Sequence, residues 1–410
     1  MPDPVLGTDP PGAAPAAAPA APAAAPPADT PTAAAAPAAG LRVDGSAIVY
    51  RLYDVGYDIR LDRALDLLAA SAPARVRPVR GEAQALQIAN PPLTVILGQE
   101  RVALAGFGAP RDAEVSARIF DFGVVSLRVR IDAPAGGTWD EFVRFGTTVD
   151  VGTDLTPVFA HHLRLLTERI GAAVERPMLA AQSEDYVVFR VNALRDAAGA
   201  PAAPSQLDDA AVVPLLLAES RPLSADARRE LLPHRFSYYA DDLALLTWDN
   251  ALVVEPRADD ADVQYILEFA NAQLLELRYY DAVLDAELPA MYDRIAEARR
   301  GVLGRFLRRG YAHLLADLQA RVADSTELVE RAENALKVTD DVYLARVYSA
   351  ALEIFRARAW RAGIDRKLGI VRDTYAMLNA EAQAARAEAL EVAIVGLILV
   401  EIVLALVLGH

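Results

Sequence analysis

Cysteine is absent from this sequence of 410 residues. Its absence excludes disulfide bonds, iron–sulfur clusters, thiolate zinc sites and cysteine nucleophiles. Lysine is scarce, because it occurs only at Lys337 and Lys367, and arginine supplies the rest of the strongly basic side chains. The formal net charge is −15 at pH 7. Because phosphate contacts need a basic surface, we expect no direct binding of nucleic acid.

The motifs that commonly carry catalysis are also missing. The sequence has no His-x-x-x-His pair, no phosphate-binding glycine loop with its lysine, and no Gly-x-Ser-x-Gly elbow. His161 and His162 are adjacent within a predicted helix, so we do not expect both to face one site. The acids of residues 257–263 are interpreted as helix caps. We therefore predict no catalytic residues, no metal and no cofactor, and we favour a role other than catalysis, with an enzyme as the alternative.

Residues 1–40 contain no lysine or arginine and consist mostly of alanine and proline. A signal peptide needs a basic start and an apolar run, and a mitochondrial transit peptide needs arginine in an amphipathic helix. Neither pattern is present, and the prolines interrupt any helix. We interpret residues 1–45 as a disordered, semi-extended leader. An extended arm that binds a partner is the alternative.

Residues 46–256 carry the signals of one α+β domain. Apolar and polar side chains alternate from Val125 to Ile131, which is the period of a strand with one buried face. Thr138 and Glu141 have the spacing of a capping box at the start of a helix. Thr156, followed by proline, predicts a second helix start. Near the end of the domain, Asp-Asp and Asp-Asn pairs predict turns between short antiparallel strands.

Residues 257–389 change to helical spacing and predict a coiled-coil-like stalk of long antiparallel helices. Apolar residues recur at intervals of three and four from Val263 to Ile295, with Pro289 expected to kink or divide this helix. A second helix is expected from about residue 304 to 337. A third, with a seam from Tyr343 to Val392, runs directly into the apolar C-terminus.

Residues 390–410 predict a single C-terminal transmembrane helix. Thirteen of the 17 residues from Val392 to Leu408 are Val, Ile or Leu, and Glu401 is the one charge among them. Seventeen helical residues span about 25 Å, which is at the short end of what a bilayer requires. A buried core helix is the alternative interpretation.

Two sets of residues near this segment are candidate contact sites. Small residues recur with Glu401 at intervals of four, which predicts a face for packing against other membrane helices. That face includes Ala389, Ala393, Glu401 and Ala405. A tolerated acid is the alternative. An arginine cluster is interpreted as contacting anionic lipid head groups, with a solvated helix face as its alternative. The cluster consists of Arg299, Arg300, Arg305, Arg308 and Arg309.

The C-terminal half has an order of residues with a likeness in a known family. The pattern consists of Trp360, a pair Lys367 and Leu368, a long helix, a pair Leu390 and Glu391, and Glu401 within the apolar segment. Together with the strand "FDFGVVSL" at 120–127, it resembles the YagE family, also called the required-for-meiotic-nuclear-division family. The resemblance implies a domain of unknown function, linked in eukaryotic members to meiotic division and to translation at the mitochondrial inner membrane.

These observations lead to one functional hypothesis with two alternatives. We predict a scaffold anchored in the bacterial inner membrane, with the bulk of the chain in the cytoplasm, which self-associates through its stalk and membrane helix. The expected partners are the membrane, further copies of the chain and other proteins. The first alternative is an enzyme or a nucleotide-responsive domain within residues 46–256. The second, implied by the resemblance, is a membrane tether for ribosomes or RNA.

Overall fold

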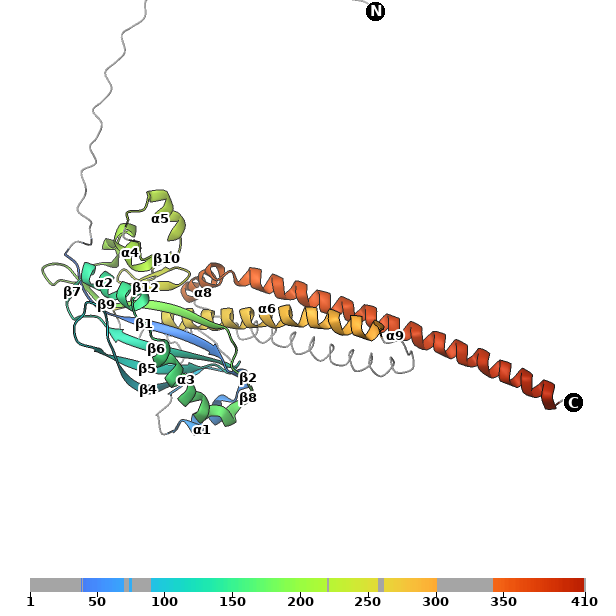
Figure 1. The fold of residues 1–410 in the computed structure, drawn as a ribbon. Coiled ribbons are helices and arrows are strands. Elements are labelled where there is room, and N and C mark those ends of the chain that lie inside the picture. The colour runs from blue at the N-terminus through green and yellow to red at the C-terminus, as the bar shows by residue number, and fades with distance from the viewer. Residues whose placement is uncertain are drawn as a thin grey trace, which may run out of the picture. The chain divides into compact units, whose positions relative to one another are not determined.

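A computed structural model describes residues 38, 40–69, 74–75, 90–219, 221–256, 262–300 and 342–408 (Figure 1). All of these residues belong to one unit of the chain, Ala36–His410. Most of the predicted leader and the whole predicted helix 304–337 lie outside the described residues. The first strand begins at Arg42, so the last residues assigned to the leader are part of the sheet.

The described elements are strands and helices up to residue 254 and helices alone after it. In chain order they are β1 (Arg42–Asp54), β2 (Gly56–Ile59), α1 (Leu61–Leu67), β3 (Ala74–Arg75), β4 (Leu93–Val102), β5 (Arg111–Ile119), β6 (Val124–Asp132), β7 (Gly137–Thr138), α2 (Trp139–Asp150), α3 (Thr156–Ile170), the 3-10 turn η2 (Gly171–Ala173), β8 (Val174–Pro177), β9 (Ser183–Arg195), the 3-10 turn η3 (Pro204–Gln206), α4 (Asp209–Leu216), α5 (Ala225–Leu231), β10 (Arg235–Phe236), β11 (Leu243–Leu246), β12 (Asn250–Val254), α6 (Asp262–Arg300), α8 (Val342–Ile354) and α9 (Ala357–Leu408).

Ten strands form one mixed sheet in the order β10-β11-β12-β9-β1-β6-β5-β4-β3, with β7 paired to β1. The pairs are antiparallel except for β12 with β9, which is parallel. A separate two-stranded sheet joins β2 and β8. The long central strand β1 is paired with β6 on one side and β9 on the other, so it organises the sheet.

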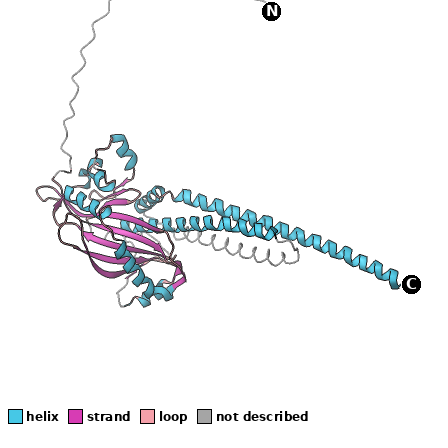
Figure 2. Ribbon diagram, viewed as in Figure 1, coloured by secondary structure: helices cyan, strands magenta, loops and turns pink. Residues whose placement is uncertain are grey.

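Both faces of the large sheet are covered, which gives three layers (Figure 2). Successive side chains of a strand point to opposite faces. In β9, Phe189 and Val191 belong to the core beneath α2 and α3, whereas Tyr186 and Val188 belong to the core beneath α6 and α8. A strand buried on both faces reads as a continuous apolar run, as in "YVVFRV".

Helix α6 is part of the core of the sheet domain. Its residues from Val263 to Leu277 are buried without interruption, and it packs on β1, β6 and β9. The predicted boundary at residue 256 therefore separates the sheet from a helix that covers one of its faces. Pro289 lies inside α6, and the helix is not divided there, because it continues to Arg300.

A buried ion pair joins α6 to the sheet. Arg118 of β5 donates to the carboxylate of Glu268, and the two side chains are 5% and 0% exposed. The Arg118 guanidinium also lies 4.6 Å from the centre of the Tyr265 ring and donates to Thr94 Oγ1 at 3.3 Å. Burial lowers the pKa of Arg118, while the charge of Glu268 acts in the opposite direction. Each charge in this layer depends on the other, because neither has access to bulk water.

Two buried carboxyl groups meet where β1 ends beneath α6. Asp54 accepts a hydrogen bond from the main-chain nitrogen of Gly56 at 3.2 Å, and burial raises its pKa to about 6. Burial, followed by the charge of Asp54, also raises the pKa of Glu276 well above its ordinary value. Glu276 is in turn hydrogen-bonded to Tyr280. The site therefore favours protonated carboxyl groups at mildly acidic pH.

Helices α8 and α9 are separated by a sharp break. Arg356 has a φ of 52°, in the left-handed region, and its main-chain nitrogen donates to the carbonyl of Glu353 at 3.0 Å. The predicted seam from Tyr343 to Val392 is therefore not one helix. Among its later members, Ile364, Leu368, Val371 and Leu378 are buried, whereas Val392 is 73% exposed. The coiled-coil interpretation is not supported, because the seam is broken at one end and uncovered at the other.

The long helices α6 and α9 run in the same direction. Arg278 lies over the ring of Trp360, and further along both helices Asp281 binds Lys367. Gly363 lies beside the same aspartate, because a Cβ atom at that position would be in van der Waals contact with Asp281 Oδ1 at 3.4 Å. The predicted antiparallel neighbour of α9, residues 304–337, lies outside the described residues.

The prediction of a C-terminal transmembrane helix is wrong. Across the described residues, no helix combines the length and the apolar character needed to cross a membrane. Residues 390–408 are the last part of a helix of 52 residues, and the apolar run within it is short and interrupted by Glu401. The fold class is therefore corrected in this part, and the predicted membrane partner and inner-membrane localisation are not supported.

Several local predictions are confirmed. Thr138 and Glu141 form a capping box, with Glu141 N donating to Thr138 Oγ1 and Thr138 N donating to Glu141 Oε2. Helix α3 begins at Thr156. The predicted turns lie between the antiparallel strands β10, β11 and β12.

The ion pair between Arg118 and Glu268 generates a stability prediction. We expect Glu268→Leu to lower the free energy of unfolding by about 3–5 kcal/mol, because it leaves a buried guanidinium without its partner. The double variant Arg118→Met, Glu268→Leu should recover most of this loss. Urea unfolding measures both values. Asp112→Leu is the control, because Asp112 pairs with Arg101 at 3.7 Å on the surface. Equal effects of Glu268→Leu and Asp112→Leu would contradict the assigned role of the buried pair.

The raised pKa of Asp54 predicts how stability changes with pH. Between its ordinary value of 3.8 and about 6, the folded chain binds this proton more tightly than the unfolded chain. The free energy of unfolding should therefore fall as pH rises through this window, by up to about 3 kcal/mol from this group. Asp54→Asn should flatten the dependence in urea titrations between pH 4 and 7, whereas Asp112→Asn, at an exposed carboxylate, should leave it unchanged. An unchanged slope in Asp54→Asn would refute the assignment.

Candidate functional site

The predicted helix-packing residues lie on the exposed end of α9. Ala393 and Glu401 are exposed, and the side chains of Ala389 and Ala405 lie outside the described ones. Leu390 and Glu391 are exposed as well. Of this predicted face, the structure therefore places Ala393 and Glu401 on the surface of the described chain.

The predicted arginine cluster falls almost wholly outside the described residues. Arg299 and Arg300 are the last residues of α6, and their side chains are not among the described ones. Arg305, Arg308 and Arg309 lie in the range 301–341, which the structure does not describe. The predicted contact with lipid head groups therefore stays without a structural test.

Three residues of the predicted pattern meet helix α6. Leu368 is buried among Leu277, Tyr280 and Leu284 of α6, and Trp360 is packed against the same cluster. Lys367 Nζ lies 2.7 Å from Asp281 Oδ1 and 2.6 Å from Asp285 Oδ1. Burial acts to lower the pKa of Lys367, but its hydrogen bonds with the two aspartates outweigh this effect and raise it. These residues fasten α9 to α6, which is a structural role.

The last turns of α9 form the largest apolar surface among the described residues. Twelve large apolar side chains between Leu390 and Leu406 are exposed, at 49% to 73%. They occupy consecutive positions, as in Ile394 and Val395 or Leu397 to Val400, so they surround the helix rather than mark one face. Contiguous apolar surface on this scale marks an interaction site.

An open cavity of about 550 Å³ lies between the end of α2, the segment from α4 to β10, and the β11–β12 turn. Its lining includes the acids Asp150, Asp249 and Glu230 together with His234 and Trp248. Burial raises the pKa values of Asp150 and Asp249. A small polar ligand could enter this space, and this cavity is where the predicted enzymatic alternative would be located.

The polar groups of this cavity also stabilise the turn beside it. Asn250 donates its side-chain amide to Asp150 at 3.3 Å, which ties the turn to α2. Thr247 Oγ1 donates to the carbonyl of Asn250 at 2.9 Å, and the Tyr186 hydroxyl donates to the same carbonyl from below. These contacts hold the β11–β12 turn in place beside the cavity.

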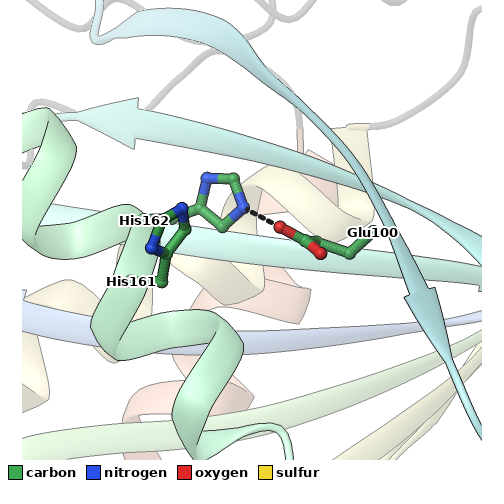
Figure 3. A group of neighbouring side chains, drawn as sticks. All are labelled: Glu100, His161 and His162. Atoms are coloured by element: carbon green, nitrogen blue, oxygen red, sulfur yellow. Dashed lines mark hydrogen bonds and ion pairs between the residues drawn. The ribbon is translucent and has the colours of Figure 1, made fainter.

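A second group of polar residues lies between β4 and α3 (Figure 3). Glu100 comes from β4, and His161 and His162 come from α3. The distance from His162 Nε2 to Glu100 Oε1 is 3.0 Å. One ligand atom of each of the three residues lies within 4.8 Å of the others. The expectation that the two histidines do not face one site stays a prediction: His161 is exposed and His162 is buried, and their rings meet edge to face with centroids 5.2 Å apart.

Comparison with known proteins identifies the domain that holds both polar groups. Residues 44–261 match the family model described as "Uncharacterized protein MJ0711, N-terminal domain". The chain belongs to this family. The matched residues cover the sheet from Asp44 of β1 to the end of β12, together with the group of Glu100, His161 and His162. They also include all lining residues of the cavity except Ile354.

A curated relative extends this result. The chain is 30% identical over 177 residues to the uncharacterised protein MJ0711 of Methanocaldococcus jannaschii, which is 43% of this chain and 53% of the relative. The chain therefore spans about half the length of that relative. No solved structure matches the chain. The resemblance to the YagE family is overturned, because the matched family is the MJ0711 N-terminal domain.

The contact of Lys367 with α6 generates a prediction about how α9 is held against α6. We expect Lys367→Met to lower the free energy of unfolding by about 1–3 kcal/mol, because it leaves Asp281, which is 18% exposed, without its cation. Amide hydrogen exchange over residues 357–378 should become faster. Arg366→Met changes the neighbouring exposed cation and should leave exchange unchanged. If the two variants behave alike, Lys367 does not fasten the helices.

Proposed function

We propose that this protein is a self-associating scaffold rather than an enzyme. In this proposal the sheet domain is joined to the helical arm of α6 and α9, and the last turns of α9 bind the same turns of further copies of the chain. The observation that carries the proposal is the uncovered apolar surface between Leu390 and Leu406.

The energetic argument rests on the size of that surface. Burying one large aliphatic side chain stabilises an association by roughly 1.5–3 kcal/mol. Twelve such side chains are exposed on α9, so their burial offers more than the entropic cost of joining two chains. A helix that is apolar all round is stable in water only inside an assembly that covers it.

The shape of the surface favours a second copy as the partner. A groove on an unrelated protein covers one stripe of a helix, whereas exposed side chains here occupy adjacent positions such as Leu397, Ile398 and Leu399. Identical helices gathered around an axis cover one another, because each brings the same unburied surface. Helix α9 also extends past Leu378, its last buried described residue, so its end is accessible to other chains.

The two alternative functions differ in their support. An enzyme or a nucleotide-responsive domain within residues 46–256 would use the cavity beside Asp150 and Asp249, where Asp150 already accepts a hydrogen bond from the Asn250 side chain. A membrane tether for ribosomes or RNA depended on the resemblance to the YagE family. The family match removes that basis, so we do not propose it.

The scaffold proposal predicts that substitutions in the α9 end dissociate the assembly. We expect the intact chain to have a defined oligomeric mass in sedimentation velocity. The double variant Leu397→Glu, Leu404→Glu should weaken association at least 100-fold, because two buried apolar contacts are lost and two charges would be desolvated.

The matched control is the double variant Leu179→Glu, Leu231→Glu. Both leucines are exposed in the sheet domain, at 61% and 47%, so the added charge is the same but lies elsewhere. This control should keep the mass of the intact chain. A monomeric intact chain, aggregates without a defined mass, or equal masses for both double variants would each refute the proposal.

A further inference from the structure

A β-bulge in β4 determines the direction of Glu100. In the pairing with β5, Ile96 lies opposite Ser116 and Gly98 lies opposite Val115, so Leu97 is an additional residue. Because side chains alternate along a strand, one inserted residue moves the later side chains to the other face. Glu100 therefore lies opposite Ala113, on the face of the sheet that α3 covers, with a side chain 36% exposed. Without the bulge, Gln99 would take this place.

Helix α3 brings the two histidines to the same place. Its inward row consists of Phe159, His162, Leu163, Leu166 and Ile170, which follow the helical period and anchor the helix on the sheet. His162 thus lies on the buried side, with a side chain 9% exposed. His161 precedes it at the exposed edge of the same helix. One imidazole is held by packing, and the other can rotate.

The spacing of the three side chains is close to that of a metal site. Two ligand atoms that each lie about 2.0–2.1 Å from a tetrahedral zinc ion are about 3.3 Å apart. His162 Nε2 and Glu100 Oε1 are 3.0 Å apart, so an ion can replace the proton between them with little movement. All three ligand atoms lie within 4.8 Å of one another, so the separations involving His161 must close by at most about 1.5 Å. Rotation of the exposed His161 side chain can supply this change.

We propose that Glu100, His161 and His162 bind one divalent metal ion of the zinc class. Two imidazole nitrogens and one carboxylate oxygen are a borderline ligand set, which favours Zn²⁺, Co²⁺ or Ni²⁺ over Mg²⁺ or Ca²⁺. Three protein ligands leave one position of a tetrahedral ion for water. This site lies in the MJ0711 N-terminal domain and is independent of self-association through α9.

A simpler explanation makes a different prediction about His161. In that explanation, the contact between His162 and Glu100 only joins α3 to β4 and has no further role. That contact does not use His161, so His161→Ala would not affect the binding of any ion. In a three-ligand site, His161 is required. His161→Ala is also a mild test, because the residue is exposed and the inward row of α3 is untouched.

The test is calorimetric titration of the full chain with zinc chloride. We expect one Zn²⁺ per chain, and at least tenfold weaker binding in both His161→Ala and Glu100→Gln, since even outer-shell substitutions cost that much. Cobalt, used as a spectroscopic probe, should give the visible absorption of a four-coordinate ion in the intact chain and not in the variants. His162 is left intact, because it contributes to the packing of α3.

The control is His234→Ala, which removes a half-buried histidine from the cavity beside the β11–β12 turn. It should bind zinc like the intact chain, and circular dichroism should show all three variants folded. The proposal is overturned if the intact chain binds no zinc. It is also overturned if His161→Ala binds as tightly as the intact chain, or if His234→Ala loses as much affinity.

Discussion

The placement of α6 on the sheet is the constraint on which the rest of the structure depends. A ten-stranded sheet with two apolar faces is stable only when both are covered, and the helices before residue 231 cover one of them. Helix α6 and α8 cover the other. The buried pair of Arg118 and Glu268 fixes where α6 lies, because a helix shifted along the sheet would leave both charges without partners in a dry layer.

This arrangement gives α6 two roles along its length. Its first turns belong to the core, and their polar side chains are buried against the sheet and α8. One of them, Gln273, accepts a hydrogen bond from the Tyr348 hydroxyl of α8. Its later turns hold α9 through Lys367 and the cluster around Leu368. The sheet domain and the helical arm of α6 and α9 therefore share one helix, which begins where the family match ends. A substitution in the core beneath α6 should for this reason also affect how α9 is held.

The sequence predicted local features better than it predicted how they are used. The capping box of Thr138 and the strand alternation near Val129 are visible because they depend on neighbours in the chain. Spacing of three and four around Leu267 is the same for a helix on a sheet and for a coiled coil, so the pattern could not distinguish core from stalk. Hydropathy likewise reports only how apolar a segment is. It suggested a membrane helix for residues 390–410, where the structure shows the end of the longer helix α9.

The site between β4 and α3 was hidden for a different reason. Adjacent histidines on an ideal helix point in different directions. Glu100, in turn, would point away from α3 in a regular strand, and only the extra residue Leu97 turns its side chain toward that helix. A bulge leaves little trace in the sequence, since Gly98 is its only local sign. The resemblance to another family depended on a few widely spaced residues such as Trp360 and Lys367, which here serve the contact between two helices.

Helix α9 extends well beyond the part of it that is buried. Leu378 is its last buried described side chain, and the turns from there to Leu408 extend about 45 Å at 1.5 Å per residue. A tilt of only 10° about Leu378 would carry the tip by about 8 Å, because displacement grows with the length of a rigid rod. A small change in the angle at which α9 packs on α6 would thus move the apolar end of α9 by a much larger distance.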